Sequence, residues 1–141
     1  MENKNYHRTI TVNASAEETM KKINKPNLWW SKEFEGSSTK LNDEFIIRFG
    51  DRHYSKQKLV EFVPNKKVMW LVTDSKLNWI EKDKYEWRGT KMIFELTPKG
   101  DKTVLNFTHE GLVPGVECYE RCVQGWDMLI KERLPNSLVL E

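Results

Sequence analysis

Hydrophobic and polar residues alternate along most of the chain, and a helical period replaces this alternation near both ends. Tyr6 to Val12 alternates and is rich in β-forming residues, which predicts a strand. Ser15 and Glu18 have the spacing of a capping box, so a short helix is expected from Ala16 to Ile23. Pro26 then predicts a second short helical turn that leads into two tryptophans.

The middle of the chain predicts a series of antiparallel strands joined by tight turns. Glycine, proline and asparagine clusters at 50–52, 64–66 and 98–101 mark the turns. The expected strands are a weak one at Glu33–Ser38 and stronger ones at Glu44–Phe49, Tyr54–Val63, Val68–Thr73, Thr90–Thr97 and Thr103–His109.

The last part of the chain changes to a period of three and four residues. The stripe consists of Cys118, Cys122, Trp126 and Leu129, which predicts an amphipathic helix from about Pro114 to Leu134. Pro135 is expected to end it, because proline has no backbone N–H and clashes with the preceding turn.

This order of elements predicts one α+β domain over residues 1–141. An antiparallel sheet with one buried face must be covered, and only the terminal helix is long enough to cover it. We therefore expect a helix-grip fold, in which a curved sheet wraps around the long C-terminal helix and two short helices follow the first strand. The space between sheet and helix would form a pocket.

Six tryptophans, six phenylalanines and four tyrosines exceed what a core of this size usually needs. Large aromatic side chains fill cores, but they also line apolar pockets. A ligand cavity of this kind should exceed roughly 300 Å³. Its expected wall residues, all on inward faces or beside them, are Trp30, Trp70, Trp79, Ile80, Trp87, Phe94, Phe107, His109, Cys122 and Trp126.

The connection from Asp74 to Arg88 is long and mixes charged with aromatic residues. One interpretation is an irregular strand whose aromatic side chains complete the core. The other is a lid over the pocket, with Trp79 and Ile80 against the ligand, a solvated tip at 81–84, and Trp87 fixed in the core.

Charge and composition exclude several classes of protein. The 23 basic and 21 acidic residues are interspersed and leave a net charge of +2, which is not the footprint of a nucleic-acid-binding protein. No run approaches the roughly 18 apolar residues of a spanning helix, so we expect no membrane insertion. The first residues do not resemble a secretory signal, and two cysteines then favour reduced thiols and a cytoplasmic location.

Candidate chemistry is sparse. His109, Cys118 and Cys122 are the residue types of a zinc site, but a fourth ligand is missing and the cysteine spacing is unusual, so no metal or other cofactor is expected. A disulfide within a regular helix is also not expected, and both cysteines are interpreted as small buried residues. His53 is interpreted as a turn residue. No catalytic motif is present.

Three stretches carry a resemblance to a known family. They are ITVNASAEE near the start, VEFVPNKKVMWLVTDSKLNWIE from Val60 to Glu81, and EWRGTKMIFELTPKGDKTVLNFTHEGLVPGVECYERCVQGW from Glu86 to Trp126. They resemble the START-like/SRPBCC superfamily, in the branch named after the activator of the heat-shock protein 90 ATPase. The resemblance implies the helix-grip fold and a hydrophobic cavity. It does not imply chaperone activation, because the eukaryotic activator has a further N-terminal domain that this sequence lacks.

The sequence also departs from the family at Arg133-Leu134-Pro135, which interrupts the last helix and predicts a shorter end to the grip. Three functions follow. The first is binding of a hydrophobic or aromatic small molecule or lipid. The second is a protein-interaction module for a chaperone or another partner, which would need an apolar patch on the outer face of the sheet. The third is a cyclase- or hydrolase-type enzyme with His109 as its acid or base.

Overall fold

The computed structural model describes residues 4–139, in which seven strands form one antiparallel sheet. The strands are β1 (Tyr6–Val12), β2 (Glu33–Gly36), β3 (Glu44–Phe49), β4 (His53–Val63), β5 (Lys67–Leu77), β6 (Lys91–Lys99) and β7 (Lys102–Glu110). The helical elements are α1 (Ala16–Ile23), the 3₁₀ turn η1 (Pro26–Leu28), α2 (Tyr119–Met128), the π turn η2 (Leu129–Arg133) and α3 (Leu134–Val139).

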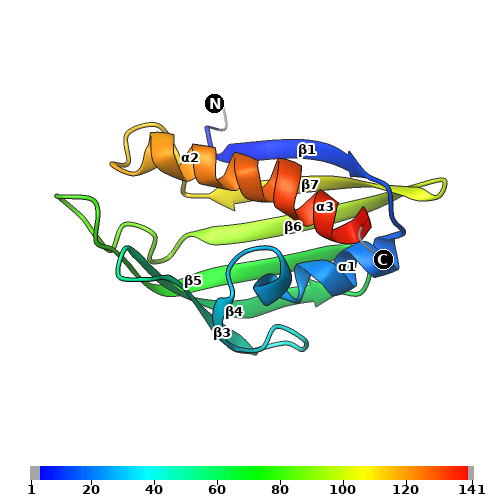
Figure 1. Cartoon of the computed structure of the whole chain (residues 1–141), viewed down its shortest axis with the longest axis horizontal. Helices are drawn as coiled ribbons and strands as arrows, with labels where there is room; N and C mark the ends of the chain where they lie inside the picture. The colour runs from blue at the N-terminus through cyan, green and yellow to red at the C-terminus, as the bar shows by residue number, and fades with distance from the viewer. Residues whose placement is uncertain (1–3, 140–141) are drawn as a thin grey trace.

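The sheet order is β1-β7-β6-β5-β4-β3-β2, so β1 alone pairs with a strand that is distant in sequence. The α2–α3 helix runs across one face of the sheet, with α1 beside its C-terminal end (Figure 1). This arrangement confirms the helix-grip fold. The inward alternation predicted for β6 and β7 is also confirmed, because Met92, Phe94, Leu105, Phe107 and His109 have no exposed surface.

The start of α1 is where the capping box predicts it. The Ser15 hydroxyl accepts a hydrogen bond from the backbone N–H of Glu18 at 3.1 Å, which satisfies one of the first-turn amides that have no partner within the helix. The Glu18 carboxylate reaches back and accepts from the Ser15 hydroxyl at 3.2 Å. Two acidic residues in the first turn and two lysines in the last also match the helix dipole.

The long C-terminal helix begins and ends later than predicted. Residues 111–118 form an irregular loop, and the first α-helical residue is Tyr119. Pro135 does not end the helix, which continues through α3 to Val139 with Leu134 and Leu138 buried. The end of the grip is therefore not shortened.

The π turn accounts for this continuity. At its end the backbone N–H of Leu134 donates to the carbonyl of Leu129, five residues earlier. The wider turn changes the hydrogen-bond register just before Pro135, which therefore sits in the first turn of α3. The proline removes one N–H from the helix ladder, and the wider turn is the local adjustment that accompanies it.

A polar group also ties α2 to the first strand. Asp127 on α2 accepts a hydrogen bond from the Tyr6 hydroxyl at 2.6 Å and from the Arg8 guanidinium at 2.9 Å. Burial, together with the hydrogen bond to Asp127, raises the pKa of Tyr6 above its ordinary value, so the phenol stays a donor. The N-terminal half of the helix is thus held over β1.

Strand β5 continues further than its pattern predicts and shortens the connection that follows. Ser75 pairs with Ser55 and Leu77 with His53, beyond a register shift near Gln57. The bulge shifts the alternation of buried and exposed residues by one position. The sequence pattern therefore does not show this end of the strand. The connection between β5 and β6 therefore covers residues 78–90.

Trp126 should be the main anchor of the helix on the sheet. It is 2 % exposed and packs against Trp30, Trp87 and Phe107, with ring centroids 5.2, 6.2 and 4.6 Å away. We expect Trp126→Ala to lower the free energy of unfolding by about 3–5 kcal/mol, as large buried truncations do. Urea unfolding measures the loss. Met128→Ala, an exposed position on the same helix, is the control and should change it by about 0.5 kcal/mol or less.

The capping box provides a second stability test. Ser15→Ala removes the acceptor for the Glu18 amide and should cost about 1 kcal/mol in urea unfolding. Ser15→Asp retains an acceptor and should restore most of that loss. A neutral Ser15→Ala variant would mean that the cap does not stabilise α1.

Candidate functional site

A pocket of about 240 Å³ opens between α2, the start of β4 and the connection after β5. We call it the tryptophan pocket, because four tryptophans border it. Five of the ten wall residues expected from sequence lie on it: Trp30, Trp79, Trp87, Cys122 and Trp126.

The other five expected wall residues do not border this pocket. Trp70, Phe94, Phe107 and His109 have no exposed surface, and Ile80 is 3 % exposed. The aromatic rings among them fill the grip between sheet and helix: Trp70 stacks on Trp30 at 6.0 Å and meets the edge of Phe94 at 5.0 Å. As a result the tryptophan pocket is smaller than the roughly 300 Å³ expected of a cavity for a drug-sized ligand.

Six further residues border the tryptophan pocket that sequence reasoning did not select. They are Phe49, His53, Arg121, Gly125, Met128 and Leu129. Leu129 belongs to the predicted stripe, and Arg121, Gly125 and Met128 recur at the spacing of the helix flank beside it, which is a usable signal. His53 is not a turn residue, since it opens β4, pairs with Leu77 and is partly buried.

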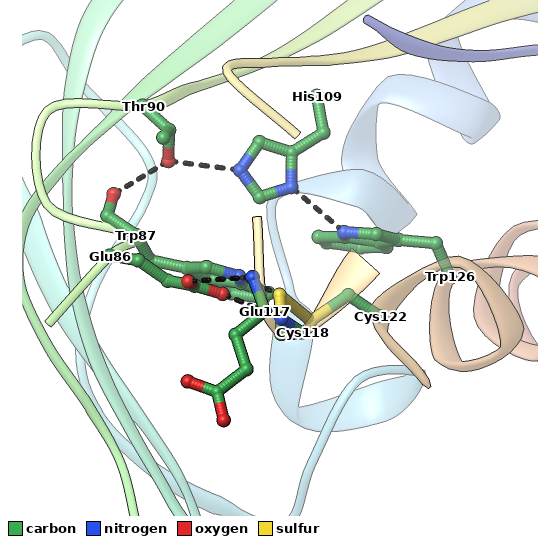
Figure 2. Close-up of a disulfide and its surroundings, with 8 residues drawn as sticks. All are labelled: Glu86, Trp87, Thr90, His109, Glu117, Cys118, Cys122 and Trp126. Carbon is green, nitrogen blue, oxygen red and sulfur yellow. Dashed lines mark hydrogen bonds between the residues drawn. A yellow bond between two sulfur atoms is a disulfide. The ribbon is translucent and has the colours of Figure 1, made fainter. Parts of the chain in front are cut away.

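His109 lies in a fully occupied chain of hydrogen bonds (Figure 2). The Trp126 indole N–H, which can only donate, donates to His109 Nδ1 at 2.9 Å. His109 Nε2–H therefore donates to the Thr90 hydroxyl at 2.9 Å, and that hydroxyl donates to the Trp87 carbonyl at 2.6 Å. These hydrogen bonds fix the tautomer of His109 and the positions of two pocket tryptophans.

The hydrogen bonds leave His109 without a free nitrogen for proton transfer. Complete burial lowers the pKa of His109 from 6.5 to about 3, so the ring is neutral near pH 7. The side chain does not border the tryptophan pocket, and both ring nitrogens are bonded. The geometry is that of a positioning residue and gives no support to His109 as an acid or base.

The two cysteines are joined in a disulfide, contrary to the expectation of two separate thiols. The expectation assumed that both lie inside a regular helix, but Cys118 is the residue before α2. The Cα atoms are 5.6 Å apart, a separation that a disulfide spans. Cys118 Sγ also accepts a hydrogen bond from the Trp87 indole N–H at 3.4 Å (Figure 2).

Two glutamates bind the connection after β5 to the start of α2, and we call this pair the carboxylate clasp. The Glu86 carboxylate accepts from the backbone N–H groups of Glu117 and Cys118 at 3.1 and 2.8 Å. The Glu117 carboxylate accepts in return from the N–H groups of Glu81 and Lys82 at 2.9 and 2.8 Å. These bonds from Glu81 and Lys82 lower the pKa of Glu117 below its ordinary value.

The clasp adds hydrogen bonds to residues 81–84, which the lid interpretation described as a solvated tip. These residues are exposed or partly exposed, but two of their amides are bonded to Glu117, and the Lys84 ammonium donates to the carbonyl of Ile80. Trp79, on the same segment, keeps its place at the pocket.

His53 brings a polar group into an otherwise aromatic wall. Its Nε2 lies 2.9 Å from the Ser55 hydroxyl, which also accepts from the Gln57 amide at 2.6 Å. Burial lowers the pKa of His53 from 6.5 to about 4. Behind this row, Gln57 Oε1 and the Ser75 hydroxyl are buried and have no hydrogen-bond partner within residues 4–139.

No group of three or more His, Cys, Asp or Glu side chains suited to holding a metal occurs in the part of the chain that the structure describes. Within that part, too, every helix lacks the length and apolar character needed to cross a bilayer.

The buried His109 makes stability depend on pH. The unfolded chain protonates this ring near pH 6.5, whereas the folded chain does so only near pH 3, so the unfolded state binds more protons between these values. Stability should therefore fall as pH drops from 7 to 5, by about 2 kcal/mol for this group. Urea unfolding of wild type and His109→Gln at both pH values measures it. The variant should lose about 2 kcal/mol less, and equal losses would contradict the assignment.

The comparisons with solved structures agree with this fold. The solution structure of the Aha1 dimer from Colwellia psychrerythraea aligns with a TM-score of 0.77 at 22% identity over 96% of both chains. A crystal structure of a Mesorhizobium loti protein aligns with a TM-score of 0.74 at 16% identity, over 95% of this chain and 97% of that one. The solution structure of a Bacillus halodurans protein aligns with a TM-score of 0.70 at 17% identity, over 95% of this chain and 96% of that one.

At these identities the alignments show the fold alone, and no curated protein matches the sequence. The family assignment comes from a family model described as "Activator of Hsp90 ATPase homolog 1-like protein", which matches residues 24–138. Because this match covers most of the sequence, the chain belongs to the activator of Hsp90 ATPase homolog 1-like family, a branch of the START-like/SRPBCC superfamily.

Proposed function

We propose that the chain binds apolar aromatic molecules of one or two rings in the tryptophan pocket. The observation that carries the proposal is the convergence of Trp30, Trp79, Trp87 and Trp126 from four different parts of the chain on one opening. Indole rings offer large, flat apolar surfaces, and offset or edge contacts between aromatic rings add to the gain from burial.

The walls of the pocket are held before any ligand arrives, which favours binding. Trp87 and Trp126 stack with ring planes 7° apart, and both belong to the hydrogen-bond chain through His109. The carboxylate clasp holds the segment that carries Trp79 and Trp87 against α2. A ligand therefore need not order these side chains, and that cost is absent from its affinity.

The volume supports small aromatic compounds rather than lipids. About 240 Å³ is less than a drug-sized ligand occupies, and an acyl chain would need the space that Trp70, Phe94 and Phe107 fill. The binding of small molecules also has more support than a protein interface. Two of the large apolar side chains exposed among the described residues, Phe49 and Met128, border the tryptophan pocket itself. The others are Leu28, Leu41, Val63 and Tyr85.

Trp79 gives the sharpest test of the proposal. It is partly buried at the pocket and lies on a connection rather than a strand. We expect Trp79→Ala to weaken binding of 2-naphthylmethanol about tenfold, since loss of one stacking partner and its buried area is worth roughly 1.4 kcal/mol. Chemical-shift titration of the tryptophan side-chain N–H resonances measures the affinity.

Tyr85 provides a matched control for this variant. It lies on the same connection, is 42 % exposed and does not border the pocket. Tyr85→Ala should leave the affinity within about twofold, and both variants should keep the midpoint of urea unfolding close to that of the wild type. Equal effects of the two variants on affinity would rule out the tryptophan pocket as the binding site.

A further inference from the structure

We infer that the tryptophan pocket selects aromatic ligands that carry an anionic oxygen, a carboxylate or a phenolate, with His53 as hydrogen-bond donor and Arg121 as counter-charge. This inference rests on the proposed function and specifies the chemical class of its ligand. It is carried by the hydrogen bonds around His53 and by the charges around the opening.

With the Gln57 amide oriented to donate to Ser55, the hydrogen bonds place the proton of His53. Gln57 donates its amide N–H to the Ser55 hydroxyl oxygen at 2.6 Å. The Ser55 hydroxyl has one hydrogen, and within residues 4–139 the remaining partner is His53 Nε2 at 2.9 Å. Nε2 therefore accepts, and a neutral imidazole that accepts at Nε2 has its hydrogen on Nδ1.

That Nδ1–H group has no partner within the described chain. The hydrogen bonds of His53 end at Ser55, yet Nδ1 is not among the buried polar atoms that lack a partner, so it keeps accessible surface. His53 borders the tryptophan pocket between Trp30, Phe49 and Trp87, with ring centroids at 6.5, 5.4 and 5.1 Å. A donor in this position is available to an acceptor oxygen of a ligand.

Burial keeps this donor neutral. Because the pKa of His53 is lowered to about 4, the ring carries no charge near pH 7. The positive charge of the pocket therefore comes from another residue.

Arg121 is that residue. It is exposed on the first turn of α2, borders the pocket, and lies over the Trp79 ring with its guanidinium carbon 5.6 Å from the centroid. It makes no hydrogen bond or ion pair with the described residues, so its donors are available to a ligand. A guanidinium offers paired N–H groups that match a carboxylate.

The charge of Arg121 disfavours a cationic ligand, which a group of tryptophans could also bind. Four indole rings would suit an organic cation through cation–π contacts. However, no aspartate or glutamate borders the pocket, and Arg121 already occupies the face of Trp79. A cationic ligand would meet like charge without compensation, whereas an anion would gain both donors.

Three probes of matched shape test the inference: 2-naphthoate, 2-naphthylmethanol and 2-naphthylmethylammonium. Each is titrated into the full-length protein at pH 7 and followed by tryptophan side-chain N–H shifts. We expect naphthoate to bind at least about tenfold more tightly than the alcohol, because hydrogen bonds to a charged acceptor are about twice as strong as neutral ones. The ammonium probe should bind more weakly than the alcohol.

Two pairs of variants assign the preference to the two residues. Arg121→Met should bring naphthoate close to the alcohol, and Arg121→Lys should retain most of the difference because the charge remains. His53→Phe should reduce naphthoate binding, and His53→Asn, whose amide N–H replaces Nδ1–H, should restore part of it. Arg121 is exposed, so its pair remains informative even where a change at His53 disturbs folding.

The outcomes separate this inference from the proposed function. Equal binding of all three probes would overturn the anionic preference and leave the proposed function intact. Tightest binding of the ammonium probe, or an unchanged naphthoate preference in Arg121→Met, would also overturn it. If none of the probes binds, the proposed function itself fails.

Discussion

The hydrogen bond from the Trp126 indole to His109 is the interaction on which the rest of the structure depends. It joins the helix to β7 inside a core that water does not reach, and a buried donor or acceptor without its partner would be costly. Because an indole can only donate, the bond also dictates the tautomer of His109 and hence the bond to Thr90. Thr90 in turn holds the backbone of Trp87, so one directional contact positions two walls of the pocket.

Most strands could be predicted from sequence because they have one buried face, and burial of one face imposes a period of two. The exception is β2, which has no buried residue and a weak pattern. The C-terminal helix was harder. A proline normally ends a helix, so Pro135 predicted the end of this one. The π turn that accommodates it has no sequence pattern we could use. The end of β5 was missed for a related reason, since a bulge shifts the alternation near Gln57.

The pocket was only half predictable, and the reason is geometric. Alternation tells which side of the sheet a residue faces, but not how far along the grip it lies. Phe94 and Phe107 face inward as Trp87 does, yet they lie under the helix while Trp87 lies at its open end. His53 was assigned to a turn because its neighbours are turn residues, and its place opposite Leu77 depends on a pairing that the sequence does not display.

The carboxylate clasp couples access to the pocket with the fraying of a helix end. Glu86 is bonded to the amides of Glu117 and Cys118, at the N-terminus of α2, where backbone donors lack partners within the helix. Local opening of a helix end requires less free energy than global unfolding. A molecule larger than the resting opening would therefore enter only during such local opening events. Its association rate would follow the amide hydrogen exchange of Glu117 and Cys118, and would be independent of how tightly it is finally held.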